Sequence, residues 1–193
     1  ALMSAVYEGS LVPFDTALRI EARWFTNIVM NPSSSAMIRS LFISKGALEK
    51  GAVRPKNVPD QSVRIIGILG AGMMGAGIAL VAAQAGIEVV LVDQDQNSAN
   101  KGKEYSEKYL TDGIKRGKIS EKIKEKTLNR ILATDDYTKL ADADLVIEAV
   151  FEDTKVKSDV TKAAVEVIHK DCIFASNTST LPISELAKAS KHP

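Results

Sequence analysis

Short apolar runs alternate with longer amphipathic stretches from residue 63 onward. Each apolar run is short enough to be a strand buried on both faces of a parallel sheet. The pattern predicts strands over 63–69, 87–92, 144–150 and 172–175, and helices over 73–85, 97–115, 120–132, 154–170 and 181–189. Strands that alternate with helices through short connections are typical of an α/β fold, and we predict a Rossmann-type, doubly wound and mostly parallel sheet.

Residues 1–60 follow a different pattern, with apolar positions three and four residues apart. Asp15 and Thr16 are candidate caps for a helix that ends at Asn31-Pro32. A second helix is predicted from Ser33 to a stop at Gly46, and 51–62, with two prolines, is a predicted linker. The apolar faces of these helices need a partner to cover them. We therefore expect 1–60 to be linker helices, and 61–193 to be one domain that is incomplete at its C-terminal end.

Composition narrows the class of protein. The 193 residues carry a net charge of +1, which gives no strong attraction to nucleic acid or anionic membranes, and aromatic residues make up 5%. No apolar stretch approaches the roughly 18 residues of a membrane span. The single cysteine, Cys172, cannot form an internal disulfide, which fits a reducing compartment.

A glycine-rich turn lies between the first predicted strand and its helix. Gly70, Gly72 and Gly75 form a GxGxxG motif, and Asp93 ends the next strand, 23 residues after Gly70. In this context the glycines permit a tight turn and a close approach to a pyrophosphate, while the acid accepts a hydrogen bond from a ribose hydroxyl and repels a 2′-phosphate. The motif thus indicates NAD rather than NADP. A packing turn in another α/β protein and an FAD site are the alternatives.

A cluster of charged residues, 148–157, follows the strand predicted over 144–150. Glu148 and Glu152 are four residues apart, and Lys157 follows in the next helix. The carboxyl ends of strands are where ligands bind in open α/β sheets, so this cluster is a candidate site. The spacing fits a helix cap equally well, because Glu152 and Asp153 precede a helix.

Short polar side chains follow the last predicted strand, in 176–180. Such residues can bind a cofactor or a substrate oxygen, and they are also common in turns and helix caps. Their spacing does not decide between these interpretations.

Taken together, four segments resemble those of L-3-hydroxyacyl-CoA dehydrogenases. They are GILGAGMMGAGIA, VDQDQ, EAVFED followed by KVK, and FASNTSTLPIS. The first segment and the helices before it resemble the α subunit of the multifunctional fatty-acid β-oxidation complex, in which an enoyl-CoA hydratase domain precedes a linker helix and the dehydrogenase. The resemblance covers about residues 12–193.

The resemblance implies a role for each matching position. Gly70, Gly72, Met74 and Gly75 would contact the cofactor pyrophosphate, and Asp93 the adenine ribose. Val150, Phe151 and Glu152 would border the nicotinamide side, and Lys157 would reach the cofactor from the next helix. Asn177 would line the pocket, and Ser179 would form a hydrogen bond near the nicotinamide. Among these, Ser179 would also donate a hydrogen bond to the 3-oxygen of the substrate. No metal is implied.

The catalytic base of the resembled family is absent from this sequence. That base is a histidine in an H-F-F-N-P segment, oriented by a glutamate, and both would lie beyond residue 193. His169 and His192 are assigned no catalytic role. The chain alone is expected to bind NAD weakly and to turn over no substrate. In the basic stretch 115–126, which has six basic and two acidic residues, Lys115 or Arg116 could meet the CoA phosphates; the alternative is a solvated helix face.

The implied reaction oxidises (S)-3-hydroxyacyl-CoA to 3-ketoacyl-CoA by hydride transfer to NAD. The implied partner is the thiolase β subunit, and the compartment would be the bacterial cytoplasm, or mitochondria or peroxisomes in a eukaryote. A non-catalytic nucleotide-binding scaffold and another Rossmann hydroxy-acid dehydrogenase remain as alternatives.

Overall fold

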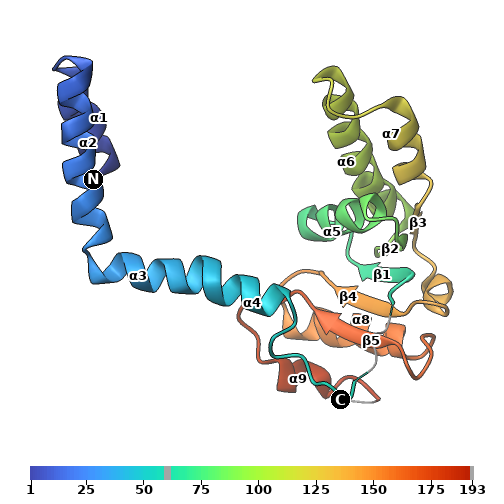
Figure 1. Cartoon of the computed structure of the whole chain (residues 1–193). Coiled ribbons are helices and arrows are strands. Elements are labelled where there is room, and N and C mark those ends of the chain that lie inside the picture. Colours follow the sequence, from blue (N-terminus) through green and yellow to red (C-terminus); the bar gives the residue numbers. More distant parts are fainter. Residues whose placement is uncertain (59–61, 192–193) are drawn as a thin grey trace. The chain divides into compact units, whose positions relative to one another are not determined.

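The computed structural model describes residues 1–58 and 62–191, traced in Figure 1. The chain divides into two compact units, Ala1–Asp60 and Gln61–Pro193, which are described separately below. The linker predicted over 51–62 has turns through residue 58. Residues 59–61, which include its C-terminal part and the predicted domain boundary, lie outside the described residues, as does His192.

The first unit is a series of helices: α1 (Leu2–Ser10), α2 (Phe14–Val29), α3 (Pro32–Ile38), a π-helical segment (Arg39–Ser44) and α4 (Lys45–Glu49). Helices α1 and α2 pack together, and Glu8 binds both Arg23 and the indole nitrogen of Trp24. The prediction that Asn31-Pro32 separates two helices is confirmed, because Asn31 caps α3.

Two boundaries predicted for the first unit are wrong. Helix α2 begins at Phe14 with Pro13 as its N-cap, so Asp15 lies in the first turn and neither it nor Thr16 is the cap. Gly46 does not stop the second helix, because it lies inside α4. A glycine ends a helix only where the backbone takes a left-handed conformation, and Gly51, two residues past the end of α4, has that conformation with φ of 76°.

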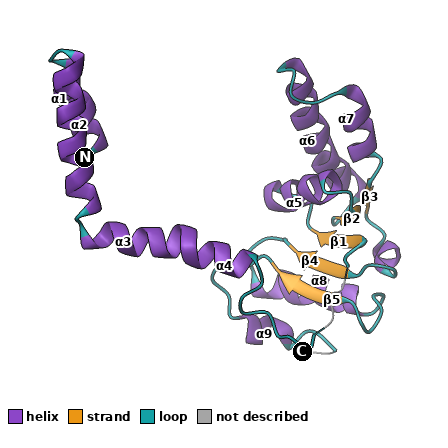
Figure 2. Cartoon of the chain, viewed as in Figure 1, coloured by secondary structure: helices purple, strands orange, loops and turns teal. Residues whose placement is uncertain are grey.

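The second unit is built on a five-stranded sheet, drawn in orange in Figure 2. Its strands are β1 (Ile65–Leu69), β2 (Glu88–Val92), β3 (Ile131–Thr134), β4 (Leu145–Glu148) and β5 (Ile173–Ser176). The order across the sheet is β3-β2-β1-β4-β5, and every pair is parallel. The chain therefore reverses its direction of winding between β1 and β4. This confirms the Rossmann-type prediction.

Strand β3 was not predicted. Helix α7 ends at Leu128, and Ile131 and Leu132 belong to the strand that pairs with β2, so the helix predicted over 120–132 is too long. The apolar run of β3 is short, and in the sequence it cannot be distinguished from the last turn of an amphipathic helix. The strand forms because the free edge of β2 pairs with it.

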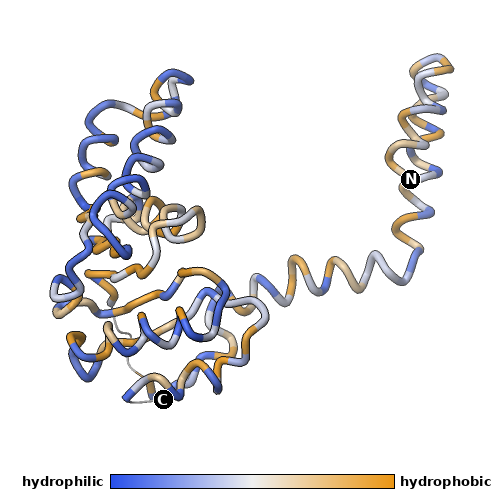
Figure 3. Tube along the Cα trace, turned by 180° about the vertical axis from the view of Figure 1, so that it is seen from behind, coloured by the Kyte–Doolittle hydropathy of each residue, from blue (hydrophilic) through white to orange (hydrophobic). Residues whose placement is uncertain are grey.

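Helices cover both faces of the sheet. The helices of this unit are α5 (Met73–Gln84), α6 (Gln96–Lys115), α7 (Glu121–Leu128), α8 (Thr154–Val165) and α9 (Ile183–Ala187), with a 3₁₀ turn at Tyr137–Leu140. Val89 and Leu91 of β2 belong to a core with α5, whereas Val90 and Val92 belong to a second core with α8. Alternate residues of one strand thus face opposite layers. In Figure 3 the strands are mainly hydrophobic, and α6 and α7 are mainly hydrophilic.

Within the described part of the chain, no helix is long and apolar enough to cross a membrane.

Candidate functional site

The candidate site lies at the edge of the sheet where β1, β2, β4 and β5 end. In a parallel sheet these carboxyl ends lie on the same side, and the crevice opens where the winding reverses, between β1 and β4. The glycine turn follows β1 and Asp93 follows β2. The charged cluster follows β4, and the polar segment follows β5. All the predicted cofactor residues thus come from connections at this one edge or from the adjacent turns of α5 and α8.

The glycine turn has the shape that a bound pyrophosphate requires. Gly70 has φ of 98°, and a Cβ there would lie 2.7 Å from the carbonyl oxygen of Ala149. A Cβ on Gly75 would lie 1.8 Å from the carbonyl oxygen of Gly70, so only glycine lets α5 approach the turn this closely. Gly72, the N-cap of α5, is exposed and has open space where a Cβ would be. The unpaired N–H groups of the first turn of α5 border this space, which fits a phosphate group.

Asp93 is held against the glycine turn. Its carboxylate accepts hydrogen bonds from the backbone N–H of Ala71 (2.6 Å) and of Gln94 (2.7 Å). Each oxygen therefore has one backbone donor and retains capacity for another. This arrangement places a negatively charged acceptor beside the phosphate-binding turn, where a ribose hydroxyl can donate to it.

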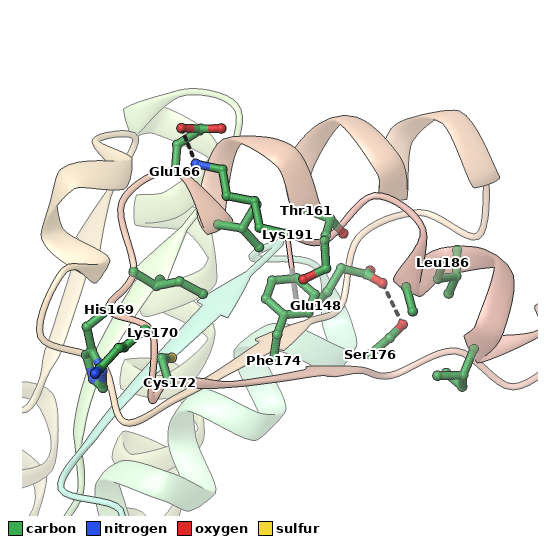
Figure 4. A pocket seen from close by; sticks show the side chains of 15 residues that line it. Glu148, Thr161, Glu166, His169, Lys170, Cys172, Phe174, Ser176, Leu186 and Lys191 are labelled. Atoms are coloured by element: carbon green, nitrogen blue, oxygen red, sulfur yellow. Dashed lines mark hydrogen bonds and ion pairs between the residues drawn. The ribbon is translucent and has the colours of Figure 1, made fainter. Parts of the chain in front are cut away.

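Glu148 and Lys157 form a buried ion pair at the end of β4. Both side chains are 1% exposed, and the Lys157 Nζ lies 2.8 Å from Oε1 and 3.0 Å from Oε2 of Glu148. The Glu148 carboxylate also accepts hydrogen bonds from the N–H of Val150 (2.8 Å) and from the Ser176 hydroxyl (2.6 Å), the latter dashed in Figure 4. The sequence-based prediction included Glu148 and Ser176 in the two polar clusters but assigned neither of them an individual role.

Glu152 joins the connection after β4 to the connection after β5. The Lys157 Nζ lies 3.1 Å from one of its oxygens. The other oxygen accepts hydrogen bonds from the Thr178 hydroxyl, the Ser179 N–H (3.3 Å) and the Thr180 hydroxyl (3.3 Å). The two polar clusters singled out in the sequence are therefore in direct contact.

The two acids before α8 have different roles. Asp153 is the N-cap of α8 and accepts hydrogen bonds from the N–H groups of Lys155 and Val156, each at 2.9 Å. The helix-cap interpretation therefore holds for Asp153. Glu152 binds the connection after β5 instead.

The other predicted residues lie around this crevice. Met74 is 52% exposed in the first turn of α5, and Phe151 is 80% exposed beside the half-buried Val150. Asn177 is exposed and its N–H donates to the carbonyl oxygen of Glu148 (2.7 Å). Ligand pockets are lined mainly by apolar side chains with a few polar groups, so these exposed apolar side chains fit a site for a partly apolar cofactor ring.

Residues 65–193 match the family described as 3-hydroxyacyl-CoA dehydrogenase, NAD binding domain. The chain belongs to this family. The match confirms the resemblance that the glycine turn and the two polar clusters indicated, and it confirms NAD as the cofactor. The roles of the individual site residues stay predictions.

Relatives of two kinds match this chain. The fatty acid oxidation complex subunit alpha of Psychrobacter cryohalolentis is 34% identical over 191 residues, which are 99% of this chain and 26% of the relative. A probable 3-hydroxybutyryl-CoA dehydrogenase of Deinococcus radiodurans is 44% identical over 127 residues, which are 66% of this chain and 45% of the relative. The chain thus spans about a quarter of the first relative's length.

A solved structure shares the fold. The 3-hydroxybutyryl-CoA dehydrogenase of Escherichia coli K12 superposes with a TM-score of 0.66 at 34% identity, and the match covers 69% of this chain and 28% of that one.

A cavity of about 480 Å³ lies elsewhere in the dehydrogenase domain, between α8, β5 and α9 (Figure 4). His169 and Cys172 line it, and burial raises the pKa of the Cys172 thiol. Glu148 and Ser176 border it from the sheet, but neither the glycine turn nor Asp93 is among its lining residues. Among residues 1–58 and 62–191, no group of three His, Cys, Asp or Glu side chains could hold a metal ion.

The basic stretch 115–126 spans the end of α6 and most of α7. The Lys115 Nζ lies 3.3 Å from Asp112, and the Lys124 Nζ lies 3.3 Å from Glu107. A contact of Lys115 or Arg116 with CoA phosphates stays a prediction.

Glu152 should make the stability of the domain depend on pH. Its pKa is lowered from 4.5 to about 2, chiefly by the hydrogen bond from Thr178 and then by that from Lys157. Since the folded state has the lower pKa, the stabilisation is fully present above pH 4.5 and is lost as the pH falls toward 2. We expect the difference in unfolding free energy between the unmodified chain and Glu152→Gln to shrink below pH 4.5, measured by urea unfolding at several pH values.

Thr178→Val provides the matched test of the cause. It removes the first donor but keeps the carboxylate, so the pH dependence should be weaker than in the unmodified chain. If the difference in unfolding free energy between the unmodified chain and Glu152→Gln stays constant across the acid range, Glu152 is not the source of the pH dependence.

Proposed function

We propose that this chain is the NAD-binding part of an (S)-3-hydroxyacyl-CoA dehydrogenase within a longer, multifunctional protein. The observation that carries the proposal is the meeting of two features at one sheet edge. One is the open glycine turn with Asp93 beside it. The other is the contact of Glu152 with the hydroxyl-rich segment after β5. Together they provide room for a dinucleotide and polar groups for a substrate oxygen.

On the adenosine side, backbone groups and one carboxylate bind the cofactor. The N–H groups at the start of α5 face the pyrophosphate beside Gly72 and Met74, and the helix dipole favours the negative charge. Asp93 accepts hydrogen bonds from the adenine ribose and disfavours the additional phosphate of NADP.

On the nicotinamide side, the connections after β4 and β5 form the pocket. Val150, Phe151 and Glu152 border the ring, and Asn177 lines the pocket. The Ser179 hydroxyl donates to the 3-oxygen of the substrate, which positions the carbon that loses hydride. NAD, when bound, supplies the hydride acceptor. Lys157 is engaged with the carboxylates of Glu148 and Glu152. From the start of α8 it reaches toward the cofactor.

The first unit has a separate role in the proposal: its helices join the dehydrogenase domain to a hydratase-type region. The support is the extent of the matches. The α subunit of Psychrobacter matches 99% of the chain, whereas the Deinococcus dehydrogenase matches 66%. The match to the α subunit thus includes the first unit, which supports its assignment to a longer, multidomain protein.

The proposal extends to a partner and a compartment. We propose that the full protein assembles with a thiolase β subunit and acts in the bacterial cytoplasm. The support is that the relatives are bacterial and are named as subunits of a complex.

Asp93→Ala tests the NAD site. The unmodified chain should bind NADH more tightly than NADPH. The variant should bind NADH roughly 10- to 100-fold more weakly, because a hydrogen bond to a charged group contributes about 1.5–3 kcal/mol. The variant should also prefer NADH over NADPH less strongly, because it lacks the negative charge that repels the 2′-phosphate of NADPH. Titration of nicotinamide fluorescence measures both affinities.

Asp95→Ala is the matched control. Asp95 is the N-cap of α6, and its carboxylate accepts hydrogen bonds from the N–H and the hydroxyl of Ser98. The control should lose some stability and keep its NADH affinity. Equal NADH affinity of Asp93→Ala and the unmodified chain would remove Asp93 from the ribose site.

A further inference from the structure

Glu148 connects three elements of the dehydrogenase domain. It ends β4, and its carboxylate is hydrogen-bonded by Lys157 of α8 and by Ser176, the last residue of β5. The carboxylate also accepts a hydrogen bond from the N–H of Val150, in the connection that follows β4. Its backbone oxygen accepts the N–H of Asn177 at 2.7 Å. A single buried carboxylate therefore fixes the starting points of both connections on the nicotinamide side.

Lys157 extends this network into the crevice. Its ammonium group has three protons, and it is shared between Glu148 and Glu152. Glu152 in turn accepts hydrogen bonds from Thr178, Ser179 and Thr180. The order of contacts is thus Glu148 to Lys157, Lys157 to Glu152, and Glu152 to the segment that carries the Ser179 hydroxyl.

A buried ion pair at this place is not explained by stability. Removing two charges from water costs several kcal/mol per ion, and apolar residues of the same volume often stabilise a fold equally well. What a saturated polar network does provide is one defined arrangement of the groups it joins. Here those groups are the two connections that border the crevice.

The topology shows which half of the dinucleotide these connections meet. Asp93 follows β2, on one side of the switch point, and marks the adenosine half. The connections after β4 and β5 lie on the other side of β1, so the nicotinamide half extends toward them. Ala149 abuts Gly70, so the connection after β4 begins directly at the glycine turn.

We propose that Glu148 is a positioning residue for the nicotinamide end of the cofactor, acting through Lys157 and Glu152. This rests on the function proposed above. Glu148 does not touch the cofactor. It fixes Lys157, which fixes Glu152, and thereby sets the distance between Val150–Glu152 and Ser179.

Glu148→Gln, assayed with two ligands, tests the proposal. The substitution keeps the shape of the side chain but removes the charge that holds Lys157. NADH has the nicotinamide, whereas ADP-ribose shares its adenosine diphosphate-ribose part and lacks the ring. We expect NADH affinity to fall about tenfold, a loss of about 1.4 kcal/mol, while ADP-ribose affinity changes less than about twofold. The shift and enhancement of NADH fluorescence on binding should also diminish, because the ring is no longer held in one environment.

Thr161→Val is the matched control. Thr161 is buried one turn further along α8, and its hydroxyl bonds to the backbone oxygen of Lys157. It should leave both affinities unchanged. If Glu148→Gln does not fold, Ser176→Ala removes a single hydrogen bond from the same carboxylate. It should weaken NADH binding two- to threefold and leave ADP-ribose binding intact.

The outcomes are distinct. Selective loss of NADH affinity supports the proposal. Equal weakening of both ligands, or unchanged NADH binding, would overturn it and leave Glu148 with a structural role only. If the unmodified chain binds neither NADH nor ADP-ribose, the proposed function itself fails.

Discussion

Gly75→Ala is expected to abolish NADH binding and to lower the unfolding free energy of the dehydrogenase domain by about 3 kcal/mol or more. The added Cβ would lie 1.8 Å from the carbonyl oxygen of Gly70 and 3.3 Å from the Ile68 side chain. Backbone atoms cannot rotate away as a flexible side chain can, so α5 must move from the sheet. The N–H groups that face the pyrophosphate would move with it. Urea unfolding and NADH titration measure the two effects.

Gly77→Ala is the control for Gly75→Ala. Gly77 lies two residues further along the same helix, and apart from the neighbouring backbone of that helix no described atom lies within 4 Å of the position of its Cβ. Alanine is the better helix former, so this variant should gain roughly 0.5–1 kcal/mol of stability and keep its affinity. A Gly75→Ala variant as stable as Gly77→Ala would show that α5 does not need the close approach.

Residues whose place is set by the local sequence could be predicted. The glycine turn and Asp93 are local features, and the spacing of a strand, a turn and a helix largely determines where they lie. Four of the strands were found for a similar reason, because runs such as 63–69 are nearly all apolar. Strand β3 was missed because its assignment depends on pairing with β2 and not on a pattern of its own.

The partners of charged side chains could not be predicted in the same way. The buried carboxylate that binds Lys157 lies nine residues away in the sequence, on another element. Glu152 and Asp153 are adjacent in sequence, and only the structure shows that one binds Thr178 while the other caps α8. One signal was available in the sequence. Glu148 interrupts an otherwise apolar strand, and a carboxylate in such a position needs a buried partner.

The two halves of the proposed cofactor site are therefore built differently. The adenosine side depends on close backbone packing, which a single methyl group at Gly75 would disrupt. The nicotinamide side depends on a charge network whose members come from β4, α8 and the segment after β5. A network of side chains can be weakened one member at a time. The second half should accordingly be more sensitive to charge than to volume.

Lys157→Met should show that sensitivity most strongly, with a loss of about 3–5 kcal/mol in the unfolding free energy, measured by urea unfolding. Methionine fills similar space, so the cost comes from leaving the Glu148 carboxylate buried without a cation. The double variant Lys157→Met/Glu148→Gln removes that charge and keeps an acceptor for the Val150 N–H. It should recover about 2 kcal/mol or more of the loss.

Lys188→Met separates the effect of burial from that of charge. Lys188 pairs with Glu185 at 2.5 Å, but the two side chains are 70% and 58% exposed, so its removal should change stability little. If the double variant were no more stable than Lys157→Met alone, the loss would come from packing and not from the unpaired carboxylate. If the double variant regains stability but still binds NADH weakly, the role of the Glu148–Lys157 pair is to fix the two connections beside the proposed nicotinamide site and not to stabilise the fold.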